Sequence, residues 1–281
     1  MPGIDNPAQD ETAEVPADCG AGSFIWYELM TEDAPASAAF YQKVVGWKVS
    51  PPAPGDPLGY RMIERDDGAM AGGILPLSQE MTQGGARPAW LGYIAVTDVD
   101  ASYAAITGDG GEGHMPPSDI EGVGRIALVT DPWGAPFYIM TPKPPEGAGQ
   151  AASSAFTVDR PQSVRWNELV TPDRTGAIAF YLHHFGWSQE GAMPMGDLGD
   201  YCFIQRDAVT IGAVMAKPDF MTHCGWSFYI GVDDIDRAVA AAREGGAHMH
   251  GDPQPIPGGE FSVTGTDPQG AAFALVGPRR E

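Results

Sequence analysis

The sequence predicts an α+β fold built from four similar β-α-β-β-β modules, two in each half of the chain. This prediction depends on an internal repeat and on the order of strand-like and helix-like segments inside it. With 281 residues, the chain is long enough for about two domains, each with its own core. Its 43% hydrophobic and 10% aromatic content supports such cores and argues against a disordered chain.

The repeat appears when the chain is laid over itself with a shift of 140 residues. Residues 24–47 then align with 164–187 without a gap, and 10 of the 24 positions are identical. A shift of 136 residues aligns 90–105 with 226–241, where eight of the 16 positions match. Chance gives about one match in 15–20 positions. We therefore expect the two halves to share one fold.

The repeat also predicts the domain limits. We expect a first domain at residues 22–143 and a second at 161–278. Residues 144–160 between them are rich in Pro, Gly, Ala and Ser, which is typical of a linker. Residues 1–21 are acidic and lack the basic and apolar parts of a secretory signal, so they predict a flexible tail.

The first module begins with a strand and a capped helix. Residues 25–31 alternate in polarity, which is typical of a strand, and Asp33 follows as the expected helix N-cap. Apolar residues at helical spacing continue to Gly46, which is expected to end the helix. Strands at 60–64 and 71–75 complete this module.

The second module repeats this order. A strand at 90–96 and a helix at 100–106 are followed by strands at 125–130 and 136–140. The last two strands flank an Asp-Pro-Trp-Gly sequence, which suits a tight turn. Both modules recur in the second half at the shifts given above.

Three sequence motifs occur in both halves. They are Trp-x-Glu-Leu-x-Thr-x-Asp leading into Phe-Tyr-x4-Gly-Trp, then Tyr-Ile-x-Val-x-Asp-x-Asp, then Thr-Asp-Pro-x-Gly-Ala. Together they resemble the vicinal oxygen chelate superfamily, which includes glyoxalase I, extradiol dioxygenases and bleomycin-resistance proteins. More closely, the chain resembles tandem actinobacterial members of the mycobacterial antigen type, often called glyoxalase-like or "hydroxylase". This resemblance implies two glyoxalase/bleomycin-resistance-like domains, each with a curved sheet around a cleft, but no particular reaction.

The resemblance can be tested at the metal positions of the superfamily. Metal-dependent members hold the ion in the cleft with His, Glu or Gln side chains. The matching positions are Trp26, Leu91 and Tyr138 in the first half, and Trp166, Ser227 and Ala274 in the second. None of these is a good metal ligand. No nucleotide-binding glycine motif lies between a strand and a helix either, so we expect no metal and no other cofactor.

Glu28 and Glu168 are the candidate catalytic residues. Each lies two residues after a tryptophan, Trp26 or Trp166, in a predicted strand and shares its face. If that face lines the cleft, burial beside aromatic rings would raise the carboxyl pKa and suit a general acid or base. The alternative is a structural glutamate that points outward or accepts a backbone hydrogen bond.

Aromatic residues of the predicted strands and two histidines at equivalent positions are candidates for ligand binding. They are Trp26, Trp90, Tyr93, Tyr138, Trp166, Trp226, Tyr229, His114 and His250. Core packing is the alternative for the aromatic residues, and an exposed strand edge is the alternative for the histidines. Rings that face the cleft would suit a flat, hydrophobic or aromatic small molecule.

Charge and composition limit the other partners. Sixteen Lys and Arg against 37 Asp and Glu give a net charge of −21, which would repel nucleic acid. No apolar run reaches the roughly 18 residues that span a membrane. Three cysteines without CxxC spacing are typical of the cytoplasm. The tandem repeat leaves both a monomer and a homodimer open.

The sequence thus predicts a protein that binds a hydrophobic small molecule in a metal-free aromatic cleft. Its expected setting is natural-product (antibiotic) metabolism, as a sequestering, tailoring or accessory protein. The first alternative is a metal-dependent enzyme of the glyoxalase or dioxygenase type, acting as a lyase, isomerase or oxygenase. The second is a protein that binds a macromolecular partner and leaves the cleft unused.

Overall fold

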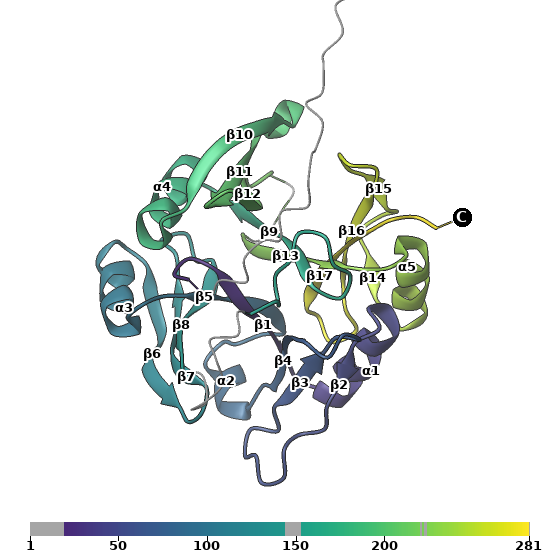
Figure 1. Cartoon of the computed structure of the whole chain (residues 1–281), viewed down its shortest axis with the longest axis horizontal. Coiled ribbons are helices and arrows are strands. Elements are labelled where there is room, and N and C mark those ends of the chain that lie inside the picture. Colours follow the sequence, from purple (N-terminus) through teal and green to yellow (C-terminus); the bar gives the residue numbers. More distant parts are fainter. Residues whose placement is uncertain (1–19, 144–152, 220, 222–223, 281) are drawn as a thin grey trace, which may run out of the picture.

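The structure is a computed structural model (Figure 1). It describes residues 20–143, 153–219, 221 and 224–280. Nearly all of the predicted acidic tail, and residues 144–152 of the predicted linker, lie outside the described residues. In the described part of the chain, no helix is long and apolar enough to cross a membrane.

The first half forms one mixed sheet with helices. Its elements are β1 (Phe24–Thr31), α1 (Ala34–Val44), β2 (Lys48–Val49), β3 (Arg61–Glu64), β4 (Met70–Pro76), α2 (Gln79–Gln83), β5 (Ala89–Ala95), α3 (Val99–Gly108), β6 (Glu112–Ile120), β7 (Gly124–Thr130) and β8 (Pro136–Pro142). The strands follow the order β2-β3-β4-β1-β5-β8-β7-β6. β1 lies at the centre of the sheet, where it pairs with β4 in parallel and with β5 antiparallel.

The second half repeats this arrangement. Its elements are β9 (Val164–Thr171), α4 (Arg174–Phe185), β10 (Ser188–Pro194), the 3₁₀ helix η1 (Gly196–Leu198), β11 (Asp200–Arg206), β12 (Val209–Ala216), β13 (Gly225–Gly231), α5 (Ile235–Glu244), β14 (His248–Met249), β15 (Gln254–Pro255), β16 (Phe261–Thr266) and β17 (Ala272–Gly277). Its strand order is β10-β11-β12-β9-β13-β17-β16-β14, and β15 pairs with β16. The predicted α+β fold of four β-α-β-β-β modules is therefore confirmed.

The helix ends follow the local signals in the sequence. The Asp33 side chain accepts a hydrogen bond from the Ala36 amide, and Asp173 does the same for Gly176. Both contacts satisfy amides that have no partner within the helix. Gly186 closes α4 with a φ of 67°, a conformation that glycine adopts without strain.

The largest hydrophobic core is shared by the two halves, because it draws residues from both sheets and from four of the helices. Two smaller clusters, one on each sheet, lie apart from it. Strand β1 separates the shared core from the smaller cluster of the first sheet. Tyr27 and Leu29 belong to the shared core, whereas Trp26 and Met30 belong to the cluster on the other face of the sheet.

Buried hydrogen bonds cross between the halves in pairs that follow the repeat. Tyr41 Oη donates to Asp267 Oδ2 at 3.0 Å, and Tyr181 Oη donates to Asp131 Oδ2 at 3.2 Å. Across the same boundary between the halves, α1 packs against α5 and α3 packs against α4 (Figure 1). The two halves share a core and buried polar contacts, so they pack against each other as one body. The limits 22–143 and 161–278 describe the repeat units of the sequence and stay a prediction as domain limits.

The described end of the linker also contacts the first half. Arg65, which is 2% exposed, donates to Ser163 Oγ at 2.6 Å and to the Ser154 carbonyl. Ala155 is fully buried. This part of the linker is therefore packed into the structure.

Candidate functional site

A buried carboxyl group lies on the face of the first sheet that is turned away from the shared core. The two-residue period of a strand places Trp26, Glu28 and Met30 on this face of β1. Tyr93 of β5 pairs with Trp26 in the sheet, and Tyr138 of β8 pairs with Tyr93. Three segments distant in sequence thus bring aromatic rings around one glutamate.

The Glu28 carboxyl is enclosed by tyrosines. Glu28 is 3% exposed, and Tyr93 Oη donates to its Oε2 at 3.0 Å. The rings of Tyr93 and Tyr138 stack, with centroids 4.2 Å apart and planes 16° apart. Trp26 Nε1 donates to Tyr60 Oη at 2.9 Å, which brings a third tyrosine to the group. We call Trp26, Glu28, Tyr60, Tyr93 and Tyr138 the first carboxyl site.

Burial raises the pKa of Glu28 from its ordinary value of 4.5 to about 7. The hydroxyls of Tyr93, Tyr60 and Tyr138 oppose this rise because they stabilise the charged form. The other carboxyl oxygen, Oε1, is buried and has no hydrogen-bond partner among the described residues. A buried acceptor without a donor is unfavourable, so the tyrosine hydroxyls compensate only part of the cost of burying this carboxyl.

The second half builds the same group around Glu168. Tyr201 Oη donates to Glu168 Oε2 at 2.6 Å, and Tyr229 Oη donates to the same oxygen at 3.1 Å. Trp166 Nε1 donates to Tyr201 Oη at 2.7 Å, as Trp26 does to Tyr60. Burial raises the pKa of Glu168 too, against the effect of the two tyrosine hydroxyls. We call Trp166, Glu168, Tyr201 and Tyr229 the second carboxyl site.

The two carboxyl sites differ in how open they are. Ala274 pairs with Tyr229 where Tyr138 pairs with Tyr93, so the second site lacks the stacked tyrosine. Glu168 and Tyr229 are half-buried, whereas Glu28 and Tyr93 are buried. The second carboxyl site therefore leaves more of its polar group and its ring within reach of solvent.

A short segment packs beside the first carboxyl site. Leu75, Leu77 and Met81 pack against the apolar cluster to which Tyr93 and Tyr138 belong. Met81 lies in α2, whose N-terminus is capped by the Ser78 side chain. The sequence analysis did not predict this helix.

Tyr60 and Tyr201 were missed by the sequence analysis. Tyr60 lies just before β3, and a Cβ on Gly73 of the neighbouring strand would come within 2.0 Å of its Oη. Tyr201 lies inside β11 and belongs to the same hydrophobic cluster as Ala213. The loops before the two tyrosines differ in length, and this difference hides their equivalence in a gapless alignment.

Trp90 and Trp226 do not line these sites, and the sequence-based assignment is corrected here. Trp90 Nε1 donates to Tyr41 Oη at 2.9 Å, and Trp226 Nε1 donates to Tyr181 Oη at 2.9 Å, within or against the shared core. Each tryptophan precedes its strand's tyrosine by three residues. This odd spacing places it on the opposite face of the strand.

His114 and His250 also lie away from the carboxyl sites. His114 is exposed on β6, the last strand of its sheet. His250 is exposed just after β14, and its Nε2 lies 3.1 Å from Thr266 Oγ1. Both residues therefore correspond to the exposed-edge alternative and not to the ligand-binding role expected of them.

The side chains of the first carboxyl site do not fit the metal centre of the superfamily. Trp26, Leu91 and Tyr138, which occupy the expected ligand positions, do lie together on this face, but they offer indole, alkyl and phenol groups. Among the described residues, one group of three His, Cys, Asp or Glu side chains is close enough to share an ion, and it lies elsewhere. We therefore assign no metal chemistry to the carboxyl sites.

Comparison with known proteins identifies the family. Residues 23–139 match the model of the Glyoxalase/Bleomycin resistance protein/Dioxygenase superfamily. The candidate glyoxylase CFP32 of Mycobacterium tuberculosis is 33% identical over 261 residues, which cover 92% of this chain and 95% of that protein. The chain therefore belongs to this superfamily, as its motifs predicted.

Two further proteins are similar to this chain over most of its length. The anthracycline biosynthesis protein DnrV of Streptomyces peucetius is 31% identical, over 91% of this chain and 93% of that protein. The Mn(II)-bound glyoxalase of Novosphingobium aromaticivorans superposes with a TM-score of 0.60 at 14% identity, over 93% of this chain and 83% of its own. The first protein is named for anthracycline biosynthesis, and the second similarity shows the fold alone.

Proposed function

We propose that the chain binds a flat, hydroxylated aromatic molecule at its carboxyl sites, as a sequestering, tailoring or accessory protein of natural-product metabolism. The observation that carries this proposal is the half-buried Glu168 carboxyl, which accepts hydrogen bonds from Tyr201 and Tyr229 beside the Trp166 ring. Aromatic rings offer an apolar surface for a flat molecule, and the carboxyl offers an acceptor that fixes its orientation.

The second carboxyl site is the one we propose to bind ligand first. Its Glu168 and Tyr229 are half-buried, and Ala274 replaces the ring that stacks on Tyr93 in the first half. A ligand ring that stacks on Tyr229 would take the role of that missing tyrosine. The net charge of −21 favours a neutral or cationic molecule over an anion.

The relative DnrV supports the chemical class of this ligand. It is named for anthracycline biosynthesis, and it matches this chain over 91% of its length. Anthracyclines contain a flat polycyclic aromatic system, which has the shape that stacking on a tyrosine ring requires.

Fluorescence titration tests this proposal. We expect 1,4-dihydroxyanthraquinone, which is neutral at pH 7, to quench tryptophan fluorescence with saturation, and Trp166→Phe to remove much of the quenching. Glu168→Gln should weaken binding about ten- to a hundredfold, because it replaces a charged acceptor by a neutral one. Anthraquinone without hydroxyl groups is the matched ligand control, and it should bind wild type and Glu168→Gln equally.

The matched variants of the first half decide between the sites. Glu28→Gln and Trp26→Phe should leave the first binding event unchanged. If neither half's variants alter binding, or if no saturable binding occurs, the proposal is wrong.

A second candidate function is general acid–base catalysis at Glu28. The pKa of about 7 favours it, because such a carboxyl can both accept and donate a proton near neutral pH. In that case Glu28→Gln would lower the turnover rate and leave the ligand dissociation constant unchanged.

A further inference from the structure

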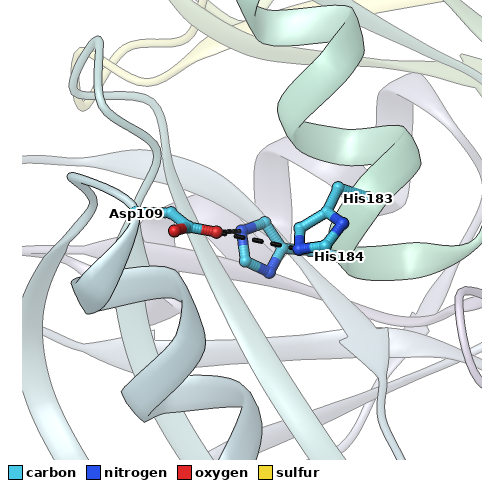
Figure 2. A group of neighbouring side chains, drawn as sticks. All are labelled: Asp109, His183 and His184. Carbon is cyan, nitrogen blue, oxygen red and sulfur yellow. Dashed lines mark ion pairs between the residues drawn. The ribbon is translucent and has the colours of Figure 1, made fainter.

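Two helix C-termini meet between the halves and bring three potential metal ligands together. α3 ends at Gly108, and Asp109 follows as its C-cap. His183 and His184 lie in the last turn of α4. Figure 2 shows both imidazole rings directed toward the Asp109 carboxyl group, each joined to it by an ion-pair contact.

The distances are close to those of a chelating group. Nε2 of His184 lies 3.2 Å from Asp109 Oδ2, and Nε2 of His183 lies 3.8 Å from the same oxygen. One candidate ligand atom from each residue lies within 4.8 Å of the other two. Metal–nitrogen bonds of about 2.0–2.1 Å require somewhat closer ligand atoms. The side chains of Asp109 and His183 are 54% and 73% exposed, so they can rotate to supply this movement.

His184 gives the group an observation that points to a ligand. Its side chain is 5% exposed, and apart from the ion-pair contact with Asp109 its Nε2 has no hydrogen-bond partner among the described residues. His184 also lines a cavity of about 350 Å³ together with Thr97 and Ser102.

The repeat contains an equivalent helix end, the C-terminus of α1, and a positively charged side chain contacts it. There, Arg237 of α5 donates to the Lys43 and Val44 carbonyls at the end of α1, at 3.1 Å each. Lys43 and Val44 are the counterparts of His183 and His184, and Arg237 is the counterpart of Ala101 in α3. The end of α4 therefore has no arginine from this position, although its negative dipole end attracts a positive charge in the same way.

We propose that Asp109, His183 and His184 form a site for a divalent transition-metal ion that links α3 of the first half to α4 of the second. Two imidazoles and one carboxylate suit Zn²⁺, Ni²⁺ or Cu²⁺ and do not suit Mg²⁺ or Ca²⁺. Two converging helix C-termini add to the attraction for a cation. The site is separate from the carboxyl sites and is independent of the function proposed for them.

Calorimetric titration of the chelator-treated full-length chain with ZnCl₂ tests this site. We expect one site per chain that binds Zn²⁺ and raises the melting temperature, and an inner-sphere absorption spectrum when Co²⁺ replaces Zn²⁺. His184→Ala and Asp109→Asn should each weaken Zn²⁺ binding by about tenfold or more, since loss of even an outer-sphere contact costs about that much. His183→Ala changes an exposed side chain, so it should weaken binding without damage to the fold.

His248→Ala is the matched control. His248 and His250 form another histidine pair, with ring centroids 5.6 Å apart, and they lie outside the proposed site. Zinc binding that the control retains and the three site variants lose supports the proposal. Absence of binding, binding that the site variants do not weaken, or binding lost in His248→Ala would each overturn it.

Discussion

At the scale of single residues, the environment of a carboxyl group decides its chemistry. Glu28 and Glu168 occupy the same position of the repeat, and both accept hydrogen bonds from tyrosine hydroxyls. Glu28 is the more enclosed of the two, with three tyrosines in its site and 3% exposure. The two glutamates therefore differ although they occupy the same motif position. Glu28 is partly protonated near neutral pH, and the Glu168 carboxyl is more accessible to solvent.

Replacement of Glu28 by Gln should change how stability depends on pH. The folded chain holds this proton up to a pKa of about 7, whereas the unfolded chain releases it near 4.5. The favourable contribution of Glu28 is thus fully present below pH 4.5 and is lost as the pH rises through 7. The difference of 7 − 4.5 = 2.5, at about 1.4 kcal/mol per unit of pH, corresponds to roughly 3 kcal/mol.

Urea unfolding at pH 5 and pH 8 measures this effect. Relative to wild type, Glu28→Gln should gain stability between pH 5 and pH 8 by up to about 3 kcal/mol. The exposed Glu32→Gln is the control and should follow wild type. Parallel pH profiles for Glu28→Gln and wild type would show that Glu28 carries no shifted proton.

At the scale of elements, a close approach of two strands fixes the position of each carboxyl group. Gly72 of β4 lies so near β1 that a Cβ would come within 2.1 Å of the Tyr27 carbonyl oxygen. Gly212 of β12 stands in the same relation to Asn167, at 1.8 Å. Glycine at these two positions lets the parallel strands pair in the register that aligns Gly73 with Glu28 and Ala213 with Glu168.

Gly72→Ala should therefore destabilise the chain. Backbone atoms cannot move aside as a flexible side chain can, so we expect a loss of at least about 1–3 kcal/mol. The denaturant midpoint measures it. Gly108→Ala at the end of α3, where an added Cβ meets nothing within 4 Å, is the control. An unchanged midpoint for Gly72→Ala would contradict the close approach of β1 and β4.

At the scale of the whole molecule, the two halves are joined at equivalent positions of the repeat. Tyr27 Oη donates to Asn167 Oδ1 at 2.7 Å. These two residues are equivalent in the repeat, so equivalent positions of the two halves contact each other. Trp47 Nε1 donates to the Gln162 carbonyl, and Trp187 Nε1 donates to the Gly22 carbonyl. All three contacts are buried, and they accompany a hydrophobic core that both halves supply.

Separation of the halves should therefore abolish a stable monomer. Expressed alone, residues 22–143 would expose one side of the shared core, so we expect aggregation, self-association or loss of fixed packing. Size-exclusion chromatography and near-ultraviolet circular dichroism report these outcomes. Co-expression with residues 153–281 should restore a folded complex. A monomeric first half with cooperative melting would contradict the shared core.

The sequence alone determined the module order, the Asp-capped helices, the superfamily and the shared face of Trp26 and Glu28. These features depend on short repeats and on the two-residue period of a strand, which are local. The same period would have excluded Trp90 and Trp226, whose odd spacing from Tyr93 and Tyr229 was available in the sequence.

Tertiary structure alone decided which groups meet. The order β3-β4-β1 brings Tyr60 to Trp26, and the packing of α3 on α4 brings Asp109 to His184. These residues are 34 and 75 positions apart in the chain (60 − 26 and 184 − 109). Neither partner carries a local signal for the other, because the distance between them is set by strand pairing and by a core to which both halves contribute.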